Sequence, residues 1–455
     1  MEAGFLAGAG HSAYGKLSRI VYTQCFLFYT TLPATKCLKT ILMARKAATS
    51  VKYHLIDQNQ QLARLLSAMR GADLIGMDTE FVAEDCYRPD LCLLQIATRD
   101  EVFLVDPLSI TQLDEVWQHL LDPKHQVVVH AGREEVLFAY RAMGRPIDRL
   151  FDVQLAVGML GGEYPSSYGK LLQRVLGQNA SKEETRTDWR RRPLTDSQME
   201  YAALDVLHLP ALHDALRSQL DSLGRIQWIE NELRQRQINL ISYEQAESWT
   251  RLPGIQTLSG RQLAIVREVW LWREKRAQHK NMPARRVLRD DLIIELARRG
   301  SADPKKISHV RGLHHSGLQR FVPELAECVS RGLGGDIPAL PWAAQQKRPR
   351  PPVLLQQFLT AAMSYLCRSN QISPAIVGTT DDVGRLASYW MSGQKLPESD
   401  EQFPNLLRGW RAEMVGKPLY EIFAGRRTLW VQHPQDEMPL ALCDVPNEPS
   451  PNGPH

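Results

Sequence analysis

The chain has few cysteines, and they form none of the patterns seen in disulfide-rich or zinc-binding proteins. Seven cysteines are scattered over 455 residues, at positions 25, 37, 86, 92, 328, 367 and 443, and no two form a CxxC pair. This spacing argues against a zinc ribbon and indicates reduced thiols, as in a cytoplasmic protein. The sequence also lacks an uninterrupted apolar run of the roughly 18 residues that a membrane span needs. We therefore expect no association with a membrane.

The first 50 residues lack the pattern of a folded domain. The apolar stretch Ile20–Tyr29 is short, is interrupted by polar residues and has no clear small-residue cleavage site, which disfavours a signal peptide. We interpret residues 1–50 as a disordered extension or a misassigned start, with Met43 as the alternative initiator. Whether residues 1–42 are present in the mature protein stays open.

The net charge of +4 combines an acidic part and a basic part of the chain. Val51–Leu216 carries about 17 Lys and Arg against about 25 Asp and Glu, so its net charge is about −8. Gln256–Gly334 carries about 16 against about 8, so its net charge is about +8. An acidic module that binds metals beside a basic module that binds phosphates suits an enzyme of nucleic acid. Simple charge balancing between solvated faces would give the same totals.

Hydrophobic periodicity divides the rest of the chain into an α/β part and a helical part. Apolar runs typical of buried strands, such as Leu74–Met77 and Val127–Val129, precede stretches of helical spacing, which predicts a mixed sheet flanked by helices. From about residue 219 the pattern is nearly all helical. The expected units are an α/β domain (51–218), a helical connector (219–255), a helical domain (256–334), a Pro-rich basic linker (335–352), a second helical domain (353–430) and a disordered tail (431–455).

Two carboxylates, Asp78 and Glu80, directly follow the apolar run Leu74–Met77. Side chains two residues apart point to the same face of a strand, so we expect both carboxylates to point the same way off the strand end. Like charges side by side repel unless a cation lies between them, and Mg²⁺ takes carboxylate oxygens. The pair therefore predicts a divalent-metal site with further acidic ligands elsewhere, although solvated surface can carry the same pattern.

Two later segments supply such acids. Glu135 follows the predicted strand Val127–Val129, with Gly132 at the turn into a helix. Tyr201 and Asp205 are four residues apart in a helical stretch and therefore point into the same space. A phenol one turn from a carboxylate can orient a water molecule.

The order of these motifs resembles that of the DEDDy superfamily of 3′–5′ exonucleases, and within it ribonuclease D. The three exonuclease motifs correspond to Asp78-Thr79-Glu80-Phe81, His130-Ala131-Gly132 and Tyr201…Asp205. Further ribonuclease D-like segments are Tyr87…Pro89…Leu93…Gln95, Val105-Asp106-Pro107-Leu108 and the stretch from Thr185 to Val206. The likeness extends from about Tyr53 to Trp430. Within it, residues 256–334 resemble an HRDC domain and residues 353–430 a second HRDC-type unit.

This resemblance implies a ribonuclease H-like α/β domain followed by two all-α HRDC-type domains. It also implies a 3′–5′ exoribonuclease that uses two divalent metal ions, Mg²⁺ or Mn²⁺. Asp78, Glu80 and Asp205 map onto metal ligands, and Tyr201 maps onto the residue that positions the attacking water. The implied partner is RNA, namely tRNA precursors and other structured RNA 3′ ends, from which 5′-mononucleotides are released. We expect a monomer located in the cytoplasm.

The fourth ligand position departs from the family, because Glu135 stands where the family has Asp. The extra methylene means that the carboxylate must fold back or hold the metal through water, which Mg²⁺ accepts. We expect Glu135 to be a working ligand, with altered affinity at one metal or a preference for Mn²⁺. The alternative is a degenerate, inactive site.

Two other functions fit the same motifs. One is a DNA 3′–5′ exonuclease of the same superfamily, which a comparison of RNA and DNA 3′ ends would distinguish through the 2′-OH. The other is a non-catalytic RNA-binding protein with a degenerate site. A nuclease assay in which Asp78→Ala abolishes activity would exclude it.

Several residues near the motifs have structural interpretations. Asp152 precedes a predicted helix and is expected to cap it, and His130 is expected to support the site or the core rather than act as a base. The apolar residues around Trp270 are expected to form core. Candidate phosphate contacts, which position RNA without reading its sequence, are Arg186, Arg190, Arg285, Arg286, Arg289, Lys305 and Lys306. A solvated charge run would look the same.

Overall fold

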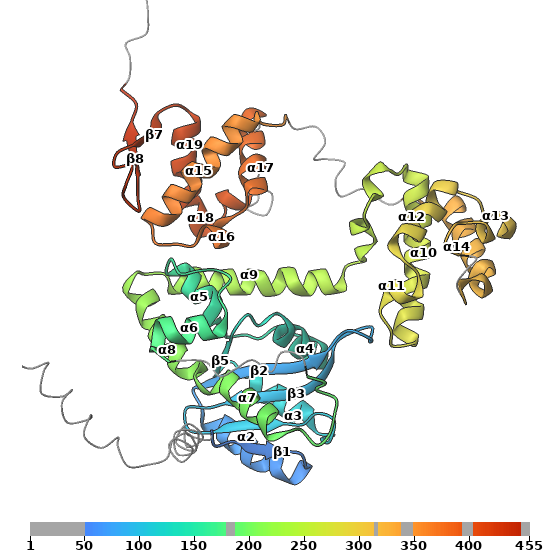
Figure 1. Ribbon diagram of the computed structural model, residues 1–455, viewed down its shortest axis with the longest axis horizontal. Coiled ribbons are helices and arrows are strands. Elements are labelled where there is room, and N and C mark those ends of the chain that lie inside the picture. The colour runs from blue at the N-terminus through green and yellow to red at the C-terminus, as the bar shows by residue number, and fades with distance from the viewer. Residues whose placement is uncertain (1–50, 179–186, 314–316, 338–348, 394–403, 447–455) are drawn as a thin grey trace, which may run out of the picture. The chain divides into compact units, whose positions relative to one another are not determined.

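The computed structural model describes residues 51–178, 187–313, 317–337, 349–393 and 404–446 (Figure 1). The expected N-terminal extension (1–50), most of the expected linker, Arg186 and the last nine residues of the expected tail lie outside these ranges. Among the described helices, none is long and apolar enough to cross a membrane.

The α/β domain is built on a six-stranded mixed sheet, as predicted. The strand order is β1-β4-β3-β2-β5-β6, in which β3 is antiparallel to both of its neighbours, β2 and β4. The pairs β1–β4, β2–β5 and β5–β6 are parallel. The strands are β1 (His54–Ile56), β2 (Leu74–Val82), β3 (Asp90–Ala97), β4 (Val102–Val105), β5 (Gln126–Val129) and β6 (Leu150–Asp152). The strands β3, β4 and β5 are almost wholly buried, because helices cover both faces of the sheet.

The expectation that the strand ends at Met77 was wrong. Strand β2 runs on to Val82, because β3 pairs with it along nearly its whole length, with a bulge between Glu80 and Phe81. Strand β5 pairs with β2 only as far as Gly76. Asp78 therefore lies inside a strand, at the point where one of its two neighbouring strands has stopped.

Helices α2, α3 and α4 lie between strands of this domain, and α5 to α8 follow the last strand. Helix α7 crosses the sheet in Figure 1 and packs against β2, β3 and β4, while α8 packs against β2 and β5. The helices are α2 (Leu62–Gly71), α3 (Leu113–Leu120), α4 (Arg133–Met143), α5 (Val153–Met159), α6 (Tyr168–Leu176), α7 (Asp196–Leu207) and α8 (Leu209–Ser222).

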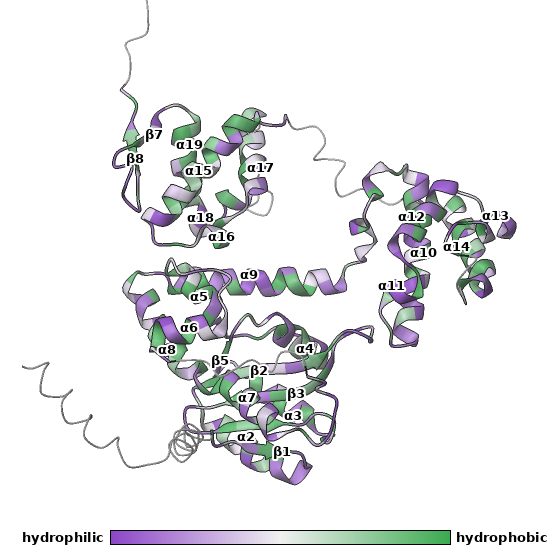
Figure 2. Ribbon diagram, viewed as in Figure 1, coloured by the Kyte–Doolittle hydropathy of each residue, from purple (hydrophilic) through white to green (hydrophobic). Residues whose placement is uncertain are grey.

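A long helix, α9 (Ile226–Gln245), and the short 3₁₀ turns Ser248–Arg251 and Ile255–Thr257 connect this domain to the first helical domain. Hydrophilic and hydrophobic residues alternate along α9 (Figure 2). In the first helical domain, Trp270 and its apolar neighbours are buried in one core with residues of α12 and α14, as predicted. Its helices are α10 (Gly260–His279), α11 (Ala284–Val287), α12 (Asp290–Arg299), α13 (Pro304–Ser308) and α14 (Val322–Gly334).

The second helical domain ends in a β-hairpin that the sequence reading missed. Strand β7 (Arg427–Val431) pairs in antiparallel fashion with β8 (Leu440–Asp444). The prediction of a disordered tail from residue 431 was therefore wrong for this hairpin, since backbone pairing fixes residues that composition alone assigned to a tail. The helices of this domain are α15 (Val353–Ser369), α16 (Pro374–Val377), α17 (Thr380–Met391), α18 (Gly409–Arg411) and α19 (Lys417–Phe423).

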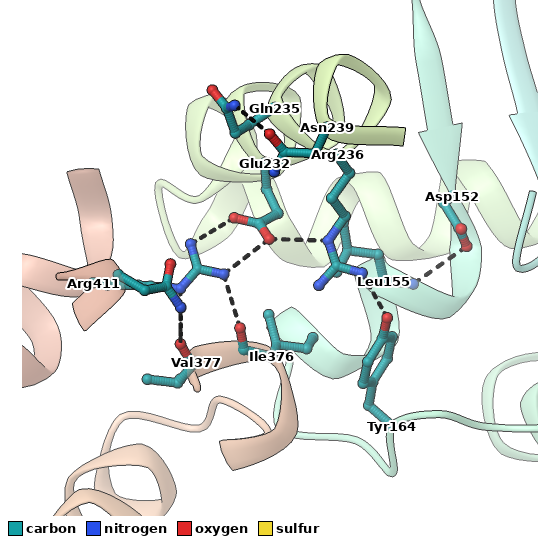
Figure 3. A network of polar contacts seen from close by, with 11 residues as sticks. Asp152, Leu155, Tyr164, Glu232, Gln235, Arg236, Asn239, Ile376, Val377 and Arg411 are labelled. Atoms are coloured by element: carbon teal, nitrogen blue, oxygen red, sulfur yellow. Dashed lines mark hydrogen bonds and ion pairs between the residues drawn. The ribbon is translucent and has the colours of Figure 1, made fainter. Parts of the chain in front are cut away.

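A buried ion pair joins the second helical domain to α9 (Figure 3). Arg411 donates to both carboxylate oxygens of Glu232, at 2.6 and 2.8 Å, and also to the carbonyl oxygen of Ile376 at 2.8 Å. Glu232 accepts a further bond of 2.9 Å from Arg236, which donates at 2.6 Å to the hydroxyl of Tyr164 in the α/β domain. These charges are satisfied from several sides, as buried charges need to be.

Candidate active site

The face of β2 that carries Asp78 and Glu80 is covered by α7 and α8. Gly76 precedes Asp78 by two residues and so shares its face. A Cβ added to Gly76 would lie 3.0 Å from Cβ of Leu209 and 3.4 Å from the carbonyl oxygen of Val206. Both carboxylates therefore point toward the layer of helices that contains the Tyr201 and Asp205 segment.

Helix α7 brings Tyr201 and Asp205 to this face. Its first turn is held by a capping box, in which the Thr195 side chain accepts from the backbone N–H of Gln198 and the Gln198 side chain accepts from that of Thr195. One turn apart on the helix, the Tyr201 hydroxyl is hydrogen-bonded to the Asp205 carboxylate. The predicted pairing of the two side chains is thus present.

Glu135 reaches the site from the first turn of α4. Gly132 is the residue before the helix, and a Cβ there would lie 2.3 Å from a methyl carbon of Val129, so only glycine fits between β5 and α4. Glu135 is buried, and its Oε1 accepts a 2.5 Å hydrogen bond from the hydroxyl of Thr79. The structure therefore places Glu135 against β2, bonded to the residue between Asp78 and Glu80 and close enough for its charge to act on both carboxylates.

Burial and neighbouring carboxylates raise the pKa of the acidic groups in this site. Burial and the charges of Glu135, Asp205 and Glu80 raise the pKa of Asp78 well above its usual value. Burial, followed by the charges of Asp205 and Glu135, raises the pKa of Glu80 to about 8. Burial raises the pKa of Glu135 to about 7, against the opposing hydrogen bond from Thr79. Acidic groups that repel one another when ionised are thus crowded here, so each resists giving up its proton.

The chemistry of the donor set suits hard divalent cations. In the part of the chain that the structure describes, no Lys or Arg forms an ion pair with Asp78, Glu80 or Glu135, and only carboxylate oxygens are offered, which Mg²⁺ and Mn²⁺ prefer. The side chains do not form a finished cage, because no three acidic, histidine or cysteine side chains of the described residues stand close enough to share one ion. Carboxylates that repel one another are expected to stand apart until a cation draws them together.

Sequence reasoning missed two neighbours of the carboxylates. Thr79 lies between Asp78 and Glu80 in sequence, but its bond to Glu135 spans 56 residues and has no local signal. Tyr168 of α6 lies close enough to Asp205 and Asp78 that their charges, after burial, raise the pKa of its phenol. Its ring packs against His130 at 5.4 Å between centroids.

Asp152 has the structural role predicted for it. Its carboxylate accepts from the backbone N–H groups of Gln154 and Leu155 and so caps α5. It also accepts from the N–H groups of Ala131 and Gly132, which fixes the turn that leads to Glu135. The capping residue of one helix therefore also positions the start of another.

His130 takes no part in the carboxylate group. A ring nitrogen is hydrogen-bonded to the carbonyl oxygen of Ser166 at 2.9 Å, and burial lowers the pKa of the imidazole. This supporting position agrees with the expectation from the sequence.

The basic candidates fall into two groups. Arg190, in the α/β domain, is paired with Asp85, while Arg285 and Arg289 of the first helical domain are paired with Asp290 and Asp291 at 2.9 and 2.8 Å. By contrast, Arg286, Lys305 and Lys306 are exposed, and the structure as described gives them no ion pair. Except for Arg190, the described candidates lie on a different domain from the carboxylates, and Arg186 lies outside the described residues.

Known proteins match this chain along most of its length. The 3′–5′ exonuclease family matches residues 53–221, and the HRDC domain family matches residues 262–329. Ribonuclease D of Gluconacetobacter diazotrophicus is 30% identical over 381 residues, which cover 83% of this chain and 94% of that protein. Ribonuclease D of Pseudomonas paraeruginosa is 29% identical over 376 residues, which cover 82% of this chain and 97% of that protein.

The chain belongs to the ribonuclease D family. The crystal structure of Escherichia coli RNase D, described as an exoribonuclease involved in structured RNA processing, shares the fold with a TM-score of 0.68 and 24% identity. That match covers 82% of this chain and 99% of the E. coli chain. This ribonuclease D family member is a hydrolytic 3′–5′ exoribonuclease, and exonucleases of its family generally depend on divalent metal ions.

Proposed function

We propose that this exoribonuclease trims the 3′ ends of structured RNA, such as tRNA precursors, and releases 5′-mononucleotides by a two-metal mechanism. Asp78, Glu80, Glu135 and Asp205 would hold the two ions, Mg²⁺ or Mn²⁺. The observation that carries this proposal is that Glu135 of α4 and Asp205 of α7 lie close enough to Asp78 and Glu80 of β2 for their charges to raise the pKa of both, while the four side chains offer only oxygen ligands.

When bound, the metal ions would acidify the attacking water and neutralise the charge that develops on the leaving 3′ oxygen. The carboxylates must give up their protons to serve as ligands, so metal binding is expected to release protons from this site. When Glu135 gives up its proton to bind a metal ion, one of its oxygens is already held by the hydrogen bond from Thr79.

Tyr201 would orient the attacking water rather than remove its proton. Burial, together with the charges of Asp205 and Glu80, raises the pKa of the Tyr201 phenol, so the hydroxyl stays protonated at neutral pH. A protonated phenol held by Asp205 on a capped helix is a fixed hydrogen-bonding group. It can set the direction of a water molecule without becoming charged.

The helical domains would hold the body of the RNA. The exposed basic residues Arg286, Lys305 and Lys306 suit contacts to phosphates, which position RNA and weaken with added salt. Arg190, Arg285 and Arg289 would contribute only after leaving their carboxylate partners, and Arg186 is retained as a candidate from its sequence position. We further infer that the protein is a monomer and that it is located in the cytoplasm; the free thiols of the described cysteines support the second inference.

The test uses the full chain and a tRNA precursor with a 3′ extension, with Mg²⁺ or Mn²⁺ and with EDTA in excess. We expect stepwise shortening from the 3′ end, 5′-mononucleotides as products and no reaction in EDTA. Asp78→Asn should lower the rate by at least about 100-fold. Loss of a group that only supports a metal ligand already costs about 10- to 100-fold, and here the ligand itself is lost. Asp73→Asn is the matched control: this exposed aspartate precedes β2, pairs with Arg99 at 3.0 Å and should be dispensable.

Equal rates for Asp78→Asn and the unaltered enzyme would contradict the proposed site. A DNA 3′ end that is shortened as fast as an RNA 3′ end of the same sequence would contradict the proposed substrate class, since the 2′-OH is the group by which a protein distinguishes RNA from DNA.

A further inference from the structure

Gln95 is a buried polar residue without a hydrogen-bond partner. It lies in the middle of β3, none of its surface is exposed, and neither Nε2 nor Oε1 has a partner among the described residues. Its neighbours Leu94 and Ile96 are apolar and equally buried. An unpaired amide is costly in such surroundings, and an apolar side chain of similar size would be more stable there.

The sheet register places Gln95 directly opposite Asp78. The two residues are paired across β2 and β3, so their side chains leave the sheet on the same face and start about 5 Å apart at Cβ. This is the face that α7 covers, as the surroundings of Gly76 show. On the other side of Gln95 the paired residue is Leu104 of β4, which is apolar. Asp78 is therefore the polar partner that the register offers.

We propose that Gln95 is a positioning residue for the Asp78 carboxylate. In the metal-loaded enzyme, its Nε2 donates a hydrogen bond to one oxygen of Asp78 and so fixes which oxygen faces the ion. Carboxylates that bind metals are themselves commonly hydrogen-bonded, and these partners set their orientation. Thr79 already makes the equivalent contact to Glu135. The inference rests on the proposed function, because it assumes that Asp78 is a metal ligand.

The experiment replaces Gln95 with methionine, which keeps the length and approximate volume of the side chain but removes the amide. Mn²⁺ binding to the full chain is measured by isothermal titration calorimetry, and the melting temperature of the metal-free protein by differential scanning calorimetry. We expect Gln95→Met to weaken Mn²⁺ binding by about 10- to 100-fold. The melting temperature without metal should stay the same or rise, because an unpaired amide has been removed. The kcat should fall while KM for RNA stays unchanged.

Gln237→Met is the matched control. Gln237 is also a buried glutamine, but its amide is fully used, since it accepts from the N–H of Ile147 and donates to the carbonyl oxygen of Ile147, both at 3.0 Å. This variant should show the opposite pattern, with a lower melting temperature and unchanged Mn²⁺ affinity. Gln95→Asn, whose amide is one methylene short of Asp78, should lose part of the Mn²⁺ affinity and serves as the readout if Gln95→Met does not fold.

Two results overturn the role of Gln95. In the first, Gln95→Met has the same Mn²⁺ affinity and the same kcat as the unaltered enzyme. If only Gln95→Asn folds, the same comparison is made with that variant. The other is a drop in melting temperature as large as that of Gln237→Met without a change in Mn²⁺ affinity, which would mark a purely structural residue. Failure of the proposed function looks different, because Asp78→Asn would then still bind Mn²⁺ and degrade RNA.

Discussion

Glu135 is the site residue expected from the sequence to depart from the family pattern, and its surroundings predict that it functions. It is buried, it accepts from Thr79, and its charge raises the pKa of both Asp78 and Glu80. We predict that Glu135→Ala lowers the metal-dependent rate on RNA by at least about 100-fold, because one ligand is lost and Thr79 is left without its partner. The rate is measured with RNA in excess at several Mn²⁺ concentrations.

The neighbouring residue provides the control. Glu134→Ala removes the same charge and the same number of atoms one position earlier, from a side chain that pairs with Arg133 instead. It should keep most of the activity. If the two variants were equally active, Glu135 would not be a ligand and the site would have to work with three carboxylates.

Spacing in the sequence was enough to pair Asp78 with Glu80 and Tyr201 with Asp205, because strand and helix periods fix which side chains share a face. Joining these pairs with Glu135 into one site rested on the resemblance to a family. Spacing was not enough for Gln95 and Thr79. Gln95 lies in a segment that resembles ribonuclease D, yet its proposed role depends on a cross-strand register that only the folded sheet defines. A bond between Thr79 and a residue 56 positions away follows from where α4 begins, which no local pattern specifies.

At the scale of elements, the close packing of β5 against α4 controls where Glu135 lies. A Cβ at Gly132 would overlap the side chain of Val129, at 2.3 Å. We predict that Gly132→Ala costs about 1–3 kcal/mol of unfolding free energy, as overpacked sites do, and lowers activity by shifting the first turn of α4. Urea unfolding and the rate on RNA are measured together.

Gly71→Ala is the comparison for that prediction, because a Cβ at Gly71, the last residue of α2, meets nothing within 4 Å. It should leave both stability and rate nearly unchanged. A Gly132→Ala protein as stable and as active as the Gly71→Ala protein would show that the contact between β5 and α4 does not fix the site.

Two elements were misjudged from the sequence, each for a reason that the structure explains. The polar residues after Met77 suggested a strand end, but β3 continues to pair with β2 as far as Val82. The segment after Val431 is rich in Pro, Asn and Glu and suggested a tail, but Leu440–Asp444 pairs with β7. In both cases pairing with a second strand supplied the order that composition did not indicate.

At the scale of the whole molecule, one buried ion pair links residues 179 positions apart in the sequence. Glu232 lies on α9 and Arg411 in the second helical domain, and both are about nine-tenths buried. Nothing in the sequence marks either residue as the partner of the other. Their contact ties the C-terminal domain to the connector that follows the exonuclease domain (Figure 3).

We predict that Arg411→Ala destabilises the protein by about 3–5 kcal/mol, because it leaves the Glu232 carboxylate buried with Arg236 as its one remaining ion-pair partner among the described residues. The free energy of unfolding is measured with urea at pH 7. Arg385→Ala is the control. It breaks an exposed pair with Asp381 within α17 and should cost no more than about 0.5 kcal/mol. Similar losses in the two variants would mean that the buried contact does not hold the domains together.

The same pair predicts how stability depends on pH. Burial alone would raise the pKa of Glu232, but Arg411 and Arg236 outweigh it and hold the pKa below 4.5. A depressed pKa in the folded state means that the contribution is present above the unfolded value and is lost as pH falls through the folded value. The difference in unfolding free energy between the unaltered protein and Glu232→Gln should therefore be largest at about pH 7. It should shrink steadily below about pH 4.5, because a protonated carboxyl group is neutral like the amide of glutamine. Urea unfolding of both proteins from pH 7 to pH 3 tests this, and a difference that does not change with pH would show that the charge on Glu232 contributes nothing to the contact.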